Sequence, residues 1–434
     1  MDKIKIPLAL IIFFSCMFYY QYISNPYGEK IITVGVFDES NWDVPSPAPN
    51  EILRQAIAEF EAENPHVKVK YVSGIPKNEY YEWLSEKIIS GDEPDLFIVT
   101  SDRFKDFAAM GVMLDLTDLV NGDKEFSIKR YYDASVDSII LNNKYYGLPL
   151  ESVPKLMFVN KTLLMQYGIS MPSNNWTWQD FYNICNMVTK DTNGDGRPDT
   201  YGCYGYNWQQ AALTNGVEPI SDENKNHYFI DDKVEDAIRF VKAINNLNNG
   251  YGVSPRDFDL GKVAFRPFTF AEYRTYQPYP WRIKKYSGFE WDVVKFPAGH
   301  YGKNVSTVDT VAMAISSRSK NKTIAWKFLK KISYDKGIQM SIIEKSQGLP
   351  VRNDILTSAE CQERFDKVMG YGNHMSLSVI DDIMSEAVHA NKFRRYWDVM
   401  LQADKFIKEI VEGNITVDNS LNQLQKEINI KIEE

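Results

Sequence analysis

The first hundred residues after the N-terminal segment alternate short apolar runs with stretches of helical periodicity. Residues 31–37 (IITVGVF) and 95–100 (DLFIVT) are apolar runs that predict buried strands. Residues 67–71 alternate apolar side chains with lysines, as a half-buried strand does. Residues 52–60 and 80–89 place apolar side chains at helical spacing. The resulting β-α-β-α-β order predicts a largely parallel sheet with helices on its faces.

Two loops follow the carboxyl ends of these predicted strands, where ligands bind in open parallel sheets. The first, residues 38–43, carries Asp38 and Trp42, and the second, residues 100–103, carries Asp102. These are candidate ligand-binding residues. Asp102 is also placed to cap the helix that follows, which is its simpler role.

A second unit begins near residue 145. Residues 156–160 (LMFVN) are an apolar run, and residues 161–167 predict a short helix before Gly168. Thr177 with Asp180 three positions later is close to a capping box and predicts the start of another helix.

The N-terminal segment carries two lysines within residues 1–5 and no charged residue from 6 to 23. At 1.5 Å per residue the uncharged run would span about 27 Å, the short limit for crossing a bilayer. Residues 1–28 are therefore expected to form a signal peptide or membrane anchor, with the rest of the chain outside the cytoplasm. Acylation at Cys16 is a minority alternative because bulky residues flank that cysteine.

Composition narrows the classes of function. The 434 residues include 58 acidic and 49 basic side chains and have a net charge of −9, which argues against a nucleic-acid partner. Aromatic residues reach 13%, which suits either ring-face recognition of a ligand or an aromatic core. The chain has no CxxC, HExxH, GxSxG or phosphate-loop motif. We therefore expect no organic cofactor.

Residues 191–199 (DTNGDGRPD) match the first part of an EF-hand calcium loop, with oxygen donors at positions 1, 3, 5 and 9 and glycine at position 6. Position 12 is Gly202 instead of glutamate, so a polar turn is the alternative. The pattern favours a structural Ca²⁺ site built from Asp191, Asn193, Asp195, Arg197 and Asp199. Cys185 and Cys203 flank this loop, and either a disulfide or two buried thiols fits that placement.

The order and spacing of many weak segments resemble the extracellular solute-binding proteins of ABC transporters, in the carbohydrate-binding family that includes maltose-binding protein. The segments share the pattern of that family and are 56–65 (AIAEFEAENP), 91–97 (GDEPDLF), 111–116 (GVMLDL), 146–149 (YGLP), 158–161 (FVNK), 178–181 (WQDF), the loop from Asp191, 261–265 (GKVAF), 325–329 (AWKFL), 348–352 (GLPVR) and 413–418 (GNITVD).

This resemblance implies an α/β, two-lobed periplasmic-binding-protein-like fold of class II, with mostly parallel sheets flanked by helices. Lobe one would comprise residues 31–150 plus 308–355, and lobe two residues 151–307 plus 356–434. The implied function is capture of a sugar or oligosaccharide between two closing lobes and its delivery to the transmembrane subunits of an ABC permease. Such a protein is a monomer without enzymatic activity on the outer face of the cytoplasmic membrane.

The resemblance also implies ligand contacts, because carboxylates accept hydrogen bonds from sugar hydroxyls and aromatic rings cover sugar faces. The positions are Asp38, Trp42, Asp102 and Glu151 in lobe one and the crossover, and Tyr206, Trp208, Phe270 with Phe268, and Trp397 in lobe two. Core packing is the alternative for each ring and is as good an explanation for Phe268 and Phe270. Asp309 stands where the family has small residues, which leaves a charged or amino-bearing ligand open.

Two other functions compete with transport. An exported carbohydrate-active enzyme would use acid and base groups drawn from Asp38, Asp102 and Glu151. A sensory binding protein would present its ligand to a membrane receptor, which an uncleaved anchor would also suit.

Overall fold

The computed structural model describes residues 28–46, 48–72, 74–218, 229–276, 289–369, 375–389, 396–413 and 415–433. The expected signal or anchor segment and Cys16 lie outside these residues, so the predictions for them stay predictions. Within the described part of the chain, no helix has the length and apolar character needed to cross a membrane.

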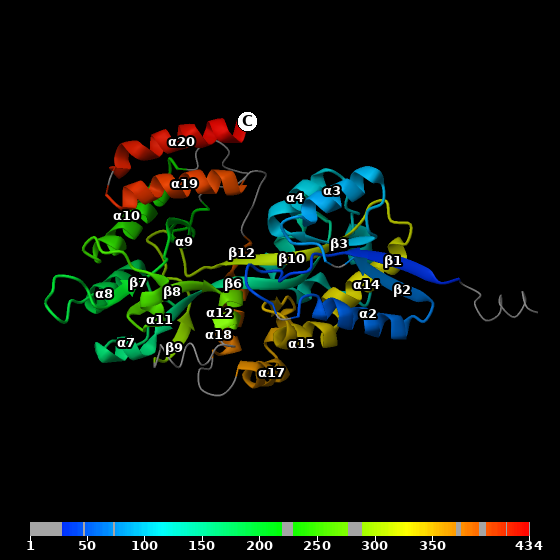
Figure 1. The fold of residues 1–434 in the computed structure, drawn as a ribbon, viewed down its shortest axis with the longest axis horizontal. Helices are drawn as coiled ribbons and strands as arrows, with labels where there is room; N and C mark the ends of the chain where they lie inside the picture. Colours follow the sequence, from blue (N-terminus) through cyan, green and yellow to red (C-terminus); the bar gives the residue numbers. More distant parts are fainter. Residues whose placement is uncertain are drawn as a thin grey trace, which may run out of the picture.

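The elements of the first 160 residues follow the predicted alternation closely. They are β1 (Lys30–Gly35), α2 (Glu51–Glu63), β2 (Val67–Val72), α3 (Tyr80–Ser90), β3 (Leu96–Thr100), α4 (Ser101–Ala109), α5 (Thr117–Gly122), α6 (Asp133–Asp137), β4 (Ile140–Leu141), β5 (Lys144–Tyr145) and β6 (Leu148–Asn160). The apolar run at 156–160 is the second half of β6, a strand long enough to run from one side of the molecule to the other (Figure 1).

The middle of the chain forms a second group of elements. They are α7 (Lys161–Gln166), α8 (Trp178–Val188), β7 (Tyr201–Cys203), α9 (Trp208–Thr214), α10 (Asp232–Asn246), α11 (Pro255–Asp259), β8 (Val263–Thr269), α12 (Phe270–Tyr276) and β9 (Trp291–Val294). The predicted capping box at Thr177 is confirmed, because the Thr177 side chain accepts from the Asp180 amide and the Asp180 carboxylate accepts from the Thr177 amide.

The C-terminal part returns to both groups. Its elements are β10 (Thr307–Ile315), α14 (Lys322–Tyr334), α15 (Lys336–Lys345), β11 (Leu349–Pro350), α16 (Asn353–Leu356), α17 (Ala359–Met369), α18 (Leu377–Glu386), β12 (Val388–His389), α19 (Tyr396–Val411) and α20 (Val417–Glu433). Figure 1 shows the blue and cyan elements with α14 on one side, the green elements with α19 and α20 on the other, and β6 and β10 running between them.

The sheet has the order β2-β1-β3-β10-β6-β8-β7, with β9 and β11 paired to β6 and β12 paired to β10. β1 pairs in parallel with β2 and β3, and β7 pairs in parallel with β8. The two connecting strands β6 and β10 run antiparallel to each other. In addition, β10 runs antiparallel to β3, and β6 runs antiparallel to β8. The α/β, two-lobed fold class is confirmed. Val311 of β10 lies opposite Thr100 of β3 on one side and Glu151 of β6 on the other.

Separate hydrophobic cores lie under the two groups of elements. One contains buried residues between positions 32 and 150 together with others between 311 and 351. A second lies between positions 157 and 296, and a third surrounds the two long C-terminal helices. A fourth core joins residues of β6 and β10 to α15, α17 and α18, so the connecting strands are packed on both groups.

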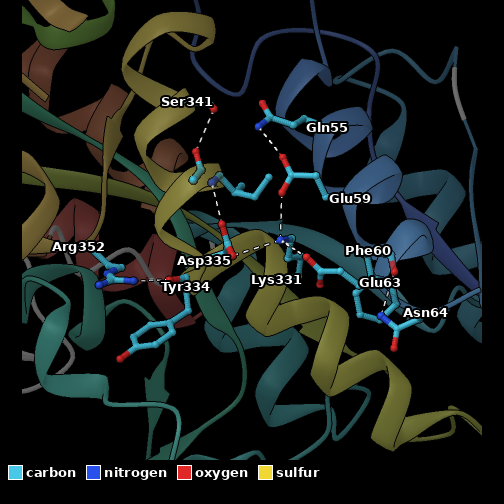
Figure 2. A network of polar contacts seen from close by, with 12 residues as sticks. Gln55, Glu59, Phe60, Glu63, Asn64, Lys331, Tyr334, Asp335, Ser341 and Arg352 are labelled. Carbon is cyan, nitrogen blue, oxygen red and sulfur yellow. Dashed lines mark hydrogen bonds and ion pairs between the residues drawn. The ribbon is translucent and has the colours of Figure 1, made fainter. Parts of the chain in front are cut away.

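Charged side chains tie α14 to α2 on the outside of the first core (Figure 2). The ammonium of Lys331 lies 3.0 Å from Glu59, 2.8 Å from Glu63 and 3.2 Å from Asp335, and the Lys331 side chain is only 9% exposed. Burial alone would lower the pKa of Lys331, but the hydrogen bonds to the three carboxylates outweigh it and raise that pKa well above its usual value.

Candidate functional site

A cavity of about 420 Å³ opens beside β10, in the size range of small-molecule sites. We call it the α19 cavity. Its walls come from α9, α19, β10 and the residues just before β10, with one side chain from β6. The lining residues are Lys155, Gln209, Gln210, Leu213, Phe296, Val305, Ser306, Thr307, Asp309, Tyr396, Trp397, Met400, Leu401 and Asp404.

The wall formed by α19 presents an apolar surface to solvent. Trp397 is 60% exposed and Leu401, one turn later, is 73% exposed. Met400 also lines the cavity but is itself buried, and Ala403 is buried in the core that α19 shares with α20. Such large exposed apolar side chains beside a cavity are typical of a site that covers the apolar face of a ligand. The structure thus brings the predicted Trp397 to the cavity.

Asp404 supplies a charged group to the same wall, and residues of α9 hold it in place. Trp208 Nε1 donates to Asp404 Oδ1 at 2.7 Å, and Gln209 Nε2 donates to the same oxygen at 3.0 Å. α9 begins with a capping box between Asn207 and Gln210, which fixes Trp208 as the first helical residue. Trp208 is only 4% exposed and packs against Phe229, so its ring belongs to the core and its N–H reaches the cavity residue.

The floor of the cavity is the connecting strand β10. Asp309 of this strand accepts a hydrogen bond from the hydroxyl of Ser101, the first residue of α4, at 3.3 Å. Burial raises the pKa of the Tyr396 phenol, and the nearby carboxylates of Asp309 and Asp404 raise it further. Tyr396 therefore keeps its proton at neutral pH and can donate a hydrogen bond.

Asp38 lies on the loop after β1 and Asp102 in the helix that follows β3 directly, and neither lines the α19 cavity. Asp102, in the first turn of α4, accepts from Thr100 Oγ1 at 2.6 Å and lies 3.8 Å from Arg103. Asp38 is exposed and accepts from Asn50 Nδ2 at 3.3 Å.

Glu151 lies on β6, in the connection between the two groups of elements, and is 4% exposed. Its carboxylate accepts hydrogen bonds from Asn41 and Ser346. Burial raises the pKa of Glu151, although these hydrogen bonds and the nearby Trp42 indole oppose the rise. A separate cavity of about 70 Å³, lined in part by Asn41, Glu151 and Ser346, adjoins this cluster.

Trp42 packs beside this carboxylate and contacts two of the cores. Its Nε1 is buried and meets no hydrogen-bond partner among the described residues. Gly348 lies against both the Glu151 carboxylate and the Trp42 indole. A Cβ at this position would stand 2.8 Å from Glu151 Oε2 and 2.9 Å from Trp42 Nε1, so only glycine fits. Trp42 and Glu151 therefore lie together, and neither lines the α19 cavity.

The structure does not bring Tyr206 or Phe270 to either cavity. Tyr206 is buried beneath α8, where its hydroxyl accepts from Trp178 Nε1 at 3.1 Å. Phe270 is fully buried and packs on Phe365 with a centroid distance of 6.2 Å. Phe268 is buried under the guanidinium of Arg266, which lies 4.0 Å from the ring centre.

The loop at 191–199 folds around its own acidic side chains. Asp191 accepts from the amides of Gly194 and Gly196, Asn193 accepts from the Asp195 amide, and Asp195 accepts from the Arg197 amide. Asp199 accepts from the Thr192 amide and hydroxyl. The named oxygens of Asp191, Asn193 and Asp195 each accept one such bond and keep a lone pair, which a hard cation can use, whereas one oxygen of Asp199 already accepts two hydrogen bonds. Across the described residues, however, no three acidic, histidine or cysteine side chains converge on one point, and the Ca²⁺ site stays a prediction.

Cys185 and Cys203 are both buried as free thiols. Burial raises the pKa of each thiol, and that of Cys203 rises to about 12. Neither thiol is therefore reactive at neutral pH.

Several cavity residues carry no signal in the sequence that marks them as ligand contacts. Gln209 and Gln210 belong to a segment whose only sequence signal is that of a helix start. Asp404 stands within a long amphipathic helix, where a single acidic residue reads as part of the solvated face. Only the pairing of α9 with α19 reveals its role.

Comparisons with known proteins agree with this fold. A family model described as bacterial extracellular solute-binding protein matches residues 45–335. A binding protein of Brucella abortus (strain 2308) is 25% identical over 290 residues, which cover 62% of this chain and 65% of that protein's length. The multiple sugar-binding protein of Streptococcus mutans serotype c (strain ATCC 700610 / UA159) is 23% identical over 305 residues, covering 66% of this chain and 69% of that protein.

Solved structures are similar over nearly the whole chain. The sugar-binding protein MalE from Xanthomonas citri gives a TM-score of 0.75 at 17% identity, covering 93% of this chain and 98% of that one. The cyclic alpha-maltosyl-1,6-maltose binding protein from Arthrobacter globiformis also gives 0.75, at 16% identity, and covers 93% of this chain and 99% of that one. At these identities the likeness establishes the fold. Because the family model spans well over half of the sequence, the chain belongs to the bacterial extracellular solute-binding protein family.

Proposed function

We propose that this chain is the substrate-binding component of an ABC importer, which captures a sugar or oligosaccharide between its lobes and delivers it to the permease. The observation that carries the proposal is the α19 cavity, where the exposed ring of Trp397 lies beside amide, hydroxyl and carboxylate groups. A pyranose offers an apolar ring face and many hydroxyls, which match such a lining. The sugar-binding names of several relatives support the same class of ligand.

Transport requires that ligand shift an equilibrium between open and closed lobes, which it can do only by binding the closed form more tightly. The strands β6 and β10 connect the two groups of elements and are the natural site of bending. Ser101 and Asp102 at the start of α4 belong to the opposite lobe from α19. In our proposal, closure brings that helix start over the sugar bound at Trp397.

The test is a thermal-shift screen of the full chain in mild detergent, against monosaccharides, oligosaccharides, polyamines and short peptides. A ligand that binds only the folded state raises the unfolding midpoint by mass action. We expect oligosaccharides to raise it and to be recovered intact. A response confined to polyamines or peptides would contradict the sugar assignment, and cleavage of the sugar would favour the exported enzyme.

A variant locates the binding. Trp397→Ala removes the exposed ring and should weaken sugar binding about tenfold or more, because stacking and burial of the ring are lost. The matched control is Tyr301→Ala, which removes an exposed aromatic side chain outside the cavity. Equal affinity of wild type and Trp397→Ala would exclude the α19 cavity as the binding site.

The proposal also covers the location of the protein and its oligomeric state. We propose that residues 1–28 anchor or export the protein to the outer face of the cytoplasmic membrane and that it acts as a monomer. The name of a Streptomyces antibioticus relative, a lipoprotein that is 26% identical over 209 residues, supports an exported location. Recovery in the membrane fraction, with protease access from the outside only, is the expected result.

A further inference from the structure

One end of lobe one lies where its parallel strands begin. Because β1 runs parallel to β2 and β3, these strands start together at the edge of the sheet opposite to their carboxyl ends. β10 connects the two edges, since it runs from Asp309 at the α19 cavity to Ile315, which lies opposite Leu96 at the start of β3. In Figure 1 the start of β1 lies on the far side of the molecule from α19.

The turn after β10 holds several chain segments together at this end. The guanidinium of Arg318 donates to the carbonyl of Ile88 in α3, and Asn321 Nδ2 donates to the carbonyl of Ile31 in β1 at 3.1 Å. The hydroxyl of Ser317 donates to a carbonyl just after α4 at 2.8 Å. The ends of α3 and α4 and the start of β1 therefore form one surface. We call this surface the β1 end, and its residues are 28–31, 88–92, 109–112 and 316–322.

Three large apolar side chains protrude from the β1 end. Ile89, in the last turn of α3, is 86% exposed, and Met110, directly after α4, is 63% exposed. Ile31 of β1 is 39% exposed. Ile89 is the most exposed large apolar side chain in the part of the chain that the structure describes. Exposed apolar side chains that gather at one place are typical of a surface that contacts a partner or a membrane.

The β1 end also carries a small excess of positive charge. Arg318 is neutralised by Glu93, which lies 2.6 Å away. Three exposed lysines remain, and none of them forms an ion pair with another described residue. Two exposed acids lie on the same surface. The lysines are Lys30, Lys320 and Lys322, and the acids are Glu29 and Asp92. Lysines beside apolar side chains suit the headgroup region of a bilayer that contains anionic lipids.

The expected membrane anchor enters the fold at the β1 end. The uncharged run of the N-terminal segment ends at Ile23, and β1 begins at Lys30. The seven peptide units between these residues reach at most about 25 Å when fully extended. An inserted anchor would therefore keep the β1 end close to the bilayer. A contact that is weak on its own becomes effective when a short tether keeps the two surfaces together.

We propose that the β1 end rests on the membrane surface, with Ile89 and Met110 among the lipid headgroups and the lysines beside anionic phosphates. Single protruding side chains can enter a fluid headgroup region, whereas a protein partner would need a broad complementary surface. The contact holds lobe one on the bilayer and leaves lobe two, which carries α19, free to move as the lobes close. This inference rests on the proposed location of the protein and adds to it the surface that meets the lipid.

The experiment measures how close the β1 end lies to lipid in the full chain. An environment-sensitive fluorescent amino acid replaces Ile89 or, as the matched control, Met165 of lobe two, which is 73% exposed. Each protein is reconstituted into vesicles of phosphatidylcholine and phosphatidylglycerol that contain nitroxide-labelled headgroups. The nitroxide should quench the probe at position 89 at least about twofold more strongly than the probe at position 165. Equal unfolding midpoints would confirm that both probes leave the fold intact.

The charge of the lysines is tested in the same vesicles. Changing Lys320→Glu together with Lys322→Glu should reduce the quenching at position 89, because the anionic headgroups then repel this surface. Lys327→Glu changes an exposed lysine of α14 outside the β1 end and should leave the quenching unchanged. Vesicles of phosphatidylcholine alone should abolish the difference between the lysine variants and wild type.

Flotation of the vesicles separates failure of the anchor from failure of the surface contact. If the full chain does not float with the vesicles, the proposed anchor falls and the inference falls with it, while the test of sugar binding is unaffected. If the chain floats but the probes at positions 89 and 165 are quenched equally, the anchor stands and the lipid contact is overturned. Unchanged quenching in the double lysine variant would likewise overturn recognition of anionic headgroups.

Discussion

Among single residues, Glu151 places an ionisable carboxyl group inside the connection between the lobes. Its carboxylate is buried on β6 and accepts from Asn41 of the loop after β1 and from Ser346 just after α15. The carbonyl of Ser346 in turn accepts from Arg274 Nη2 of α12 at 3.0 Å. A chain of hydrogen bonds therefore links α12, the connecting strand and the loop of the opposite lobe.

The raised pKa of Glu151 predicts a specific pH dependence. Because the folded state holds this proton more tightly than the unfolded state, its contribution to the free energy of unfolding is complete below the ordinary value of 4.5 and is lost as pH rises through the raised pKa. Glu151→Gln removes this titration. Urea unfolding below pH 4.5 and at neutral pH should therefore show the variant gaining stability relative to wild type as pH rises.

Parallel pH profiles for the two proteins would show instead that Glu151 has the same proton affinity in both states.

Two tryptophans show what the sequence can and cannot predict for a residue. Trp208 and Trp397 both stand among polar neighbours, and both were candidates for the ligand site. Trp397 is exposed on the cavity wall, whereas Trp208 is covered by Phe229 and by helices about 200 positions later in the chain. Local polarity does not encode which distant helix covers a ring, so the site could be predicted only in part.

At the scale of elements, local signals predicted the first three strands with the helices between them, and the first strand and helices of the second unit. The helical stripe at 52–60, the alternation at 67–71 and the capping box at Thr177 each depend on near neighbours, and each element is present. The long antiparallel pairing of β6 with β10 joins segments more than 150 positions apart and leaves no local periodic signal. The sequence alone therefore indicated the elements but not this pairing.

The ion cluster between α2 and α14 predicts a stability effect. Lys331→Met removes the cation that three carboxylates share and leaves those carboxylates close to one another, which should lower the free energy of unfolding by about 2 kcal/mol. Lys327→Met, at an exposed lysine of the same helix, should change it by less than about 0.5 kcal/mol. Similar losses in both variants, measured by urea unfolding, would mean that the cluster adds nothing beyond surface charge.

The loop at 191–199 predicts a response to calcium. If it binds Ca²⁺ as its sequence predicts, millimolar Ca²⁺ should raise the unfolding midpoint of wild type more than Mg²⁺ does, because the larger ion accepts an irregular set of oxygens. Asp191→Asn removes a charged ligand and should abolish the difference. An equal response of wild type and variant would exclude the site.

At the scale of the whole molecule, the strands β6 and β10 and the core around them join the two groups of elements, which is the arrangement that hinge closure requires. The family pattern predicted this division, because its segments span nearly the whole chain after the N-terminal segment. Trp397 was a candidate ligand contact, but the remaining walls of the α19 cavity could not be predicted in the same way, since they depend on which helices face the connecting strands.

The proposed binding of a sugar in the α19 cavity can be observed directly. The most direct measurement is a crystal structure of the protein with a saturating oligosaccharide identified by the thermal-shift screen. We predict a sugar ring against the exposed face of Trp397, with the start of α4 closed over it. A sugar bound away from α9, α19 and β10, or a cavity empty at saturation, would exclude the α19 cavity as the binding site.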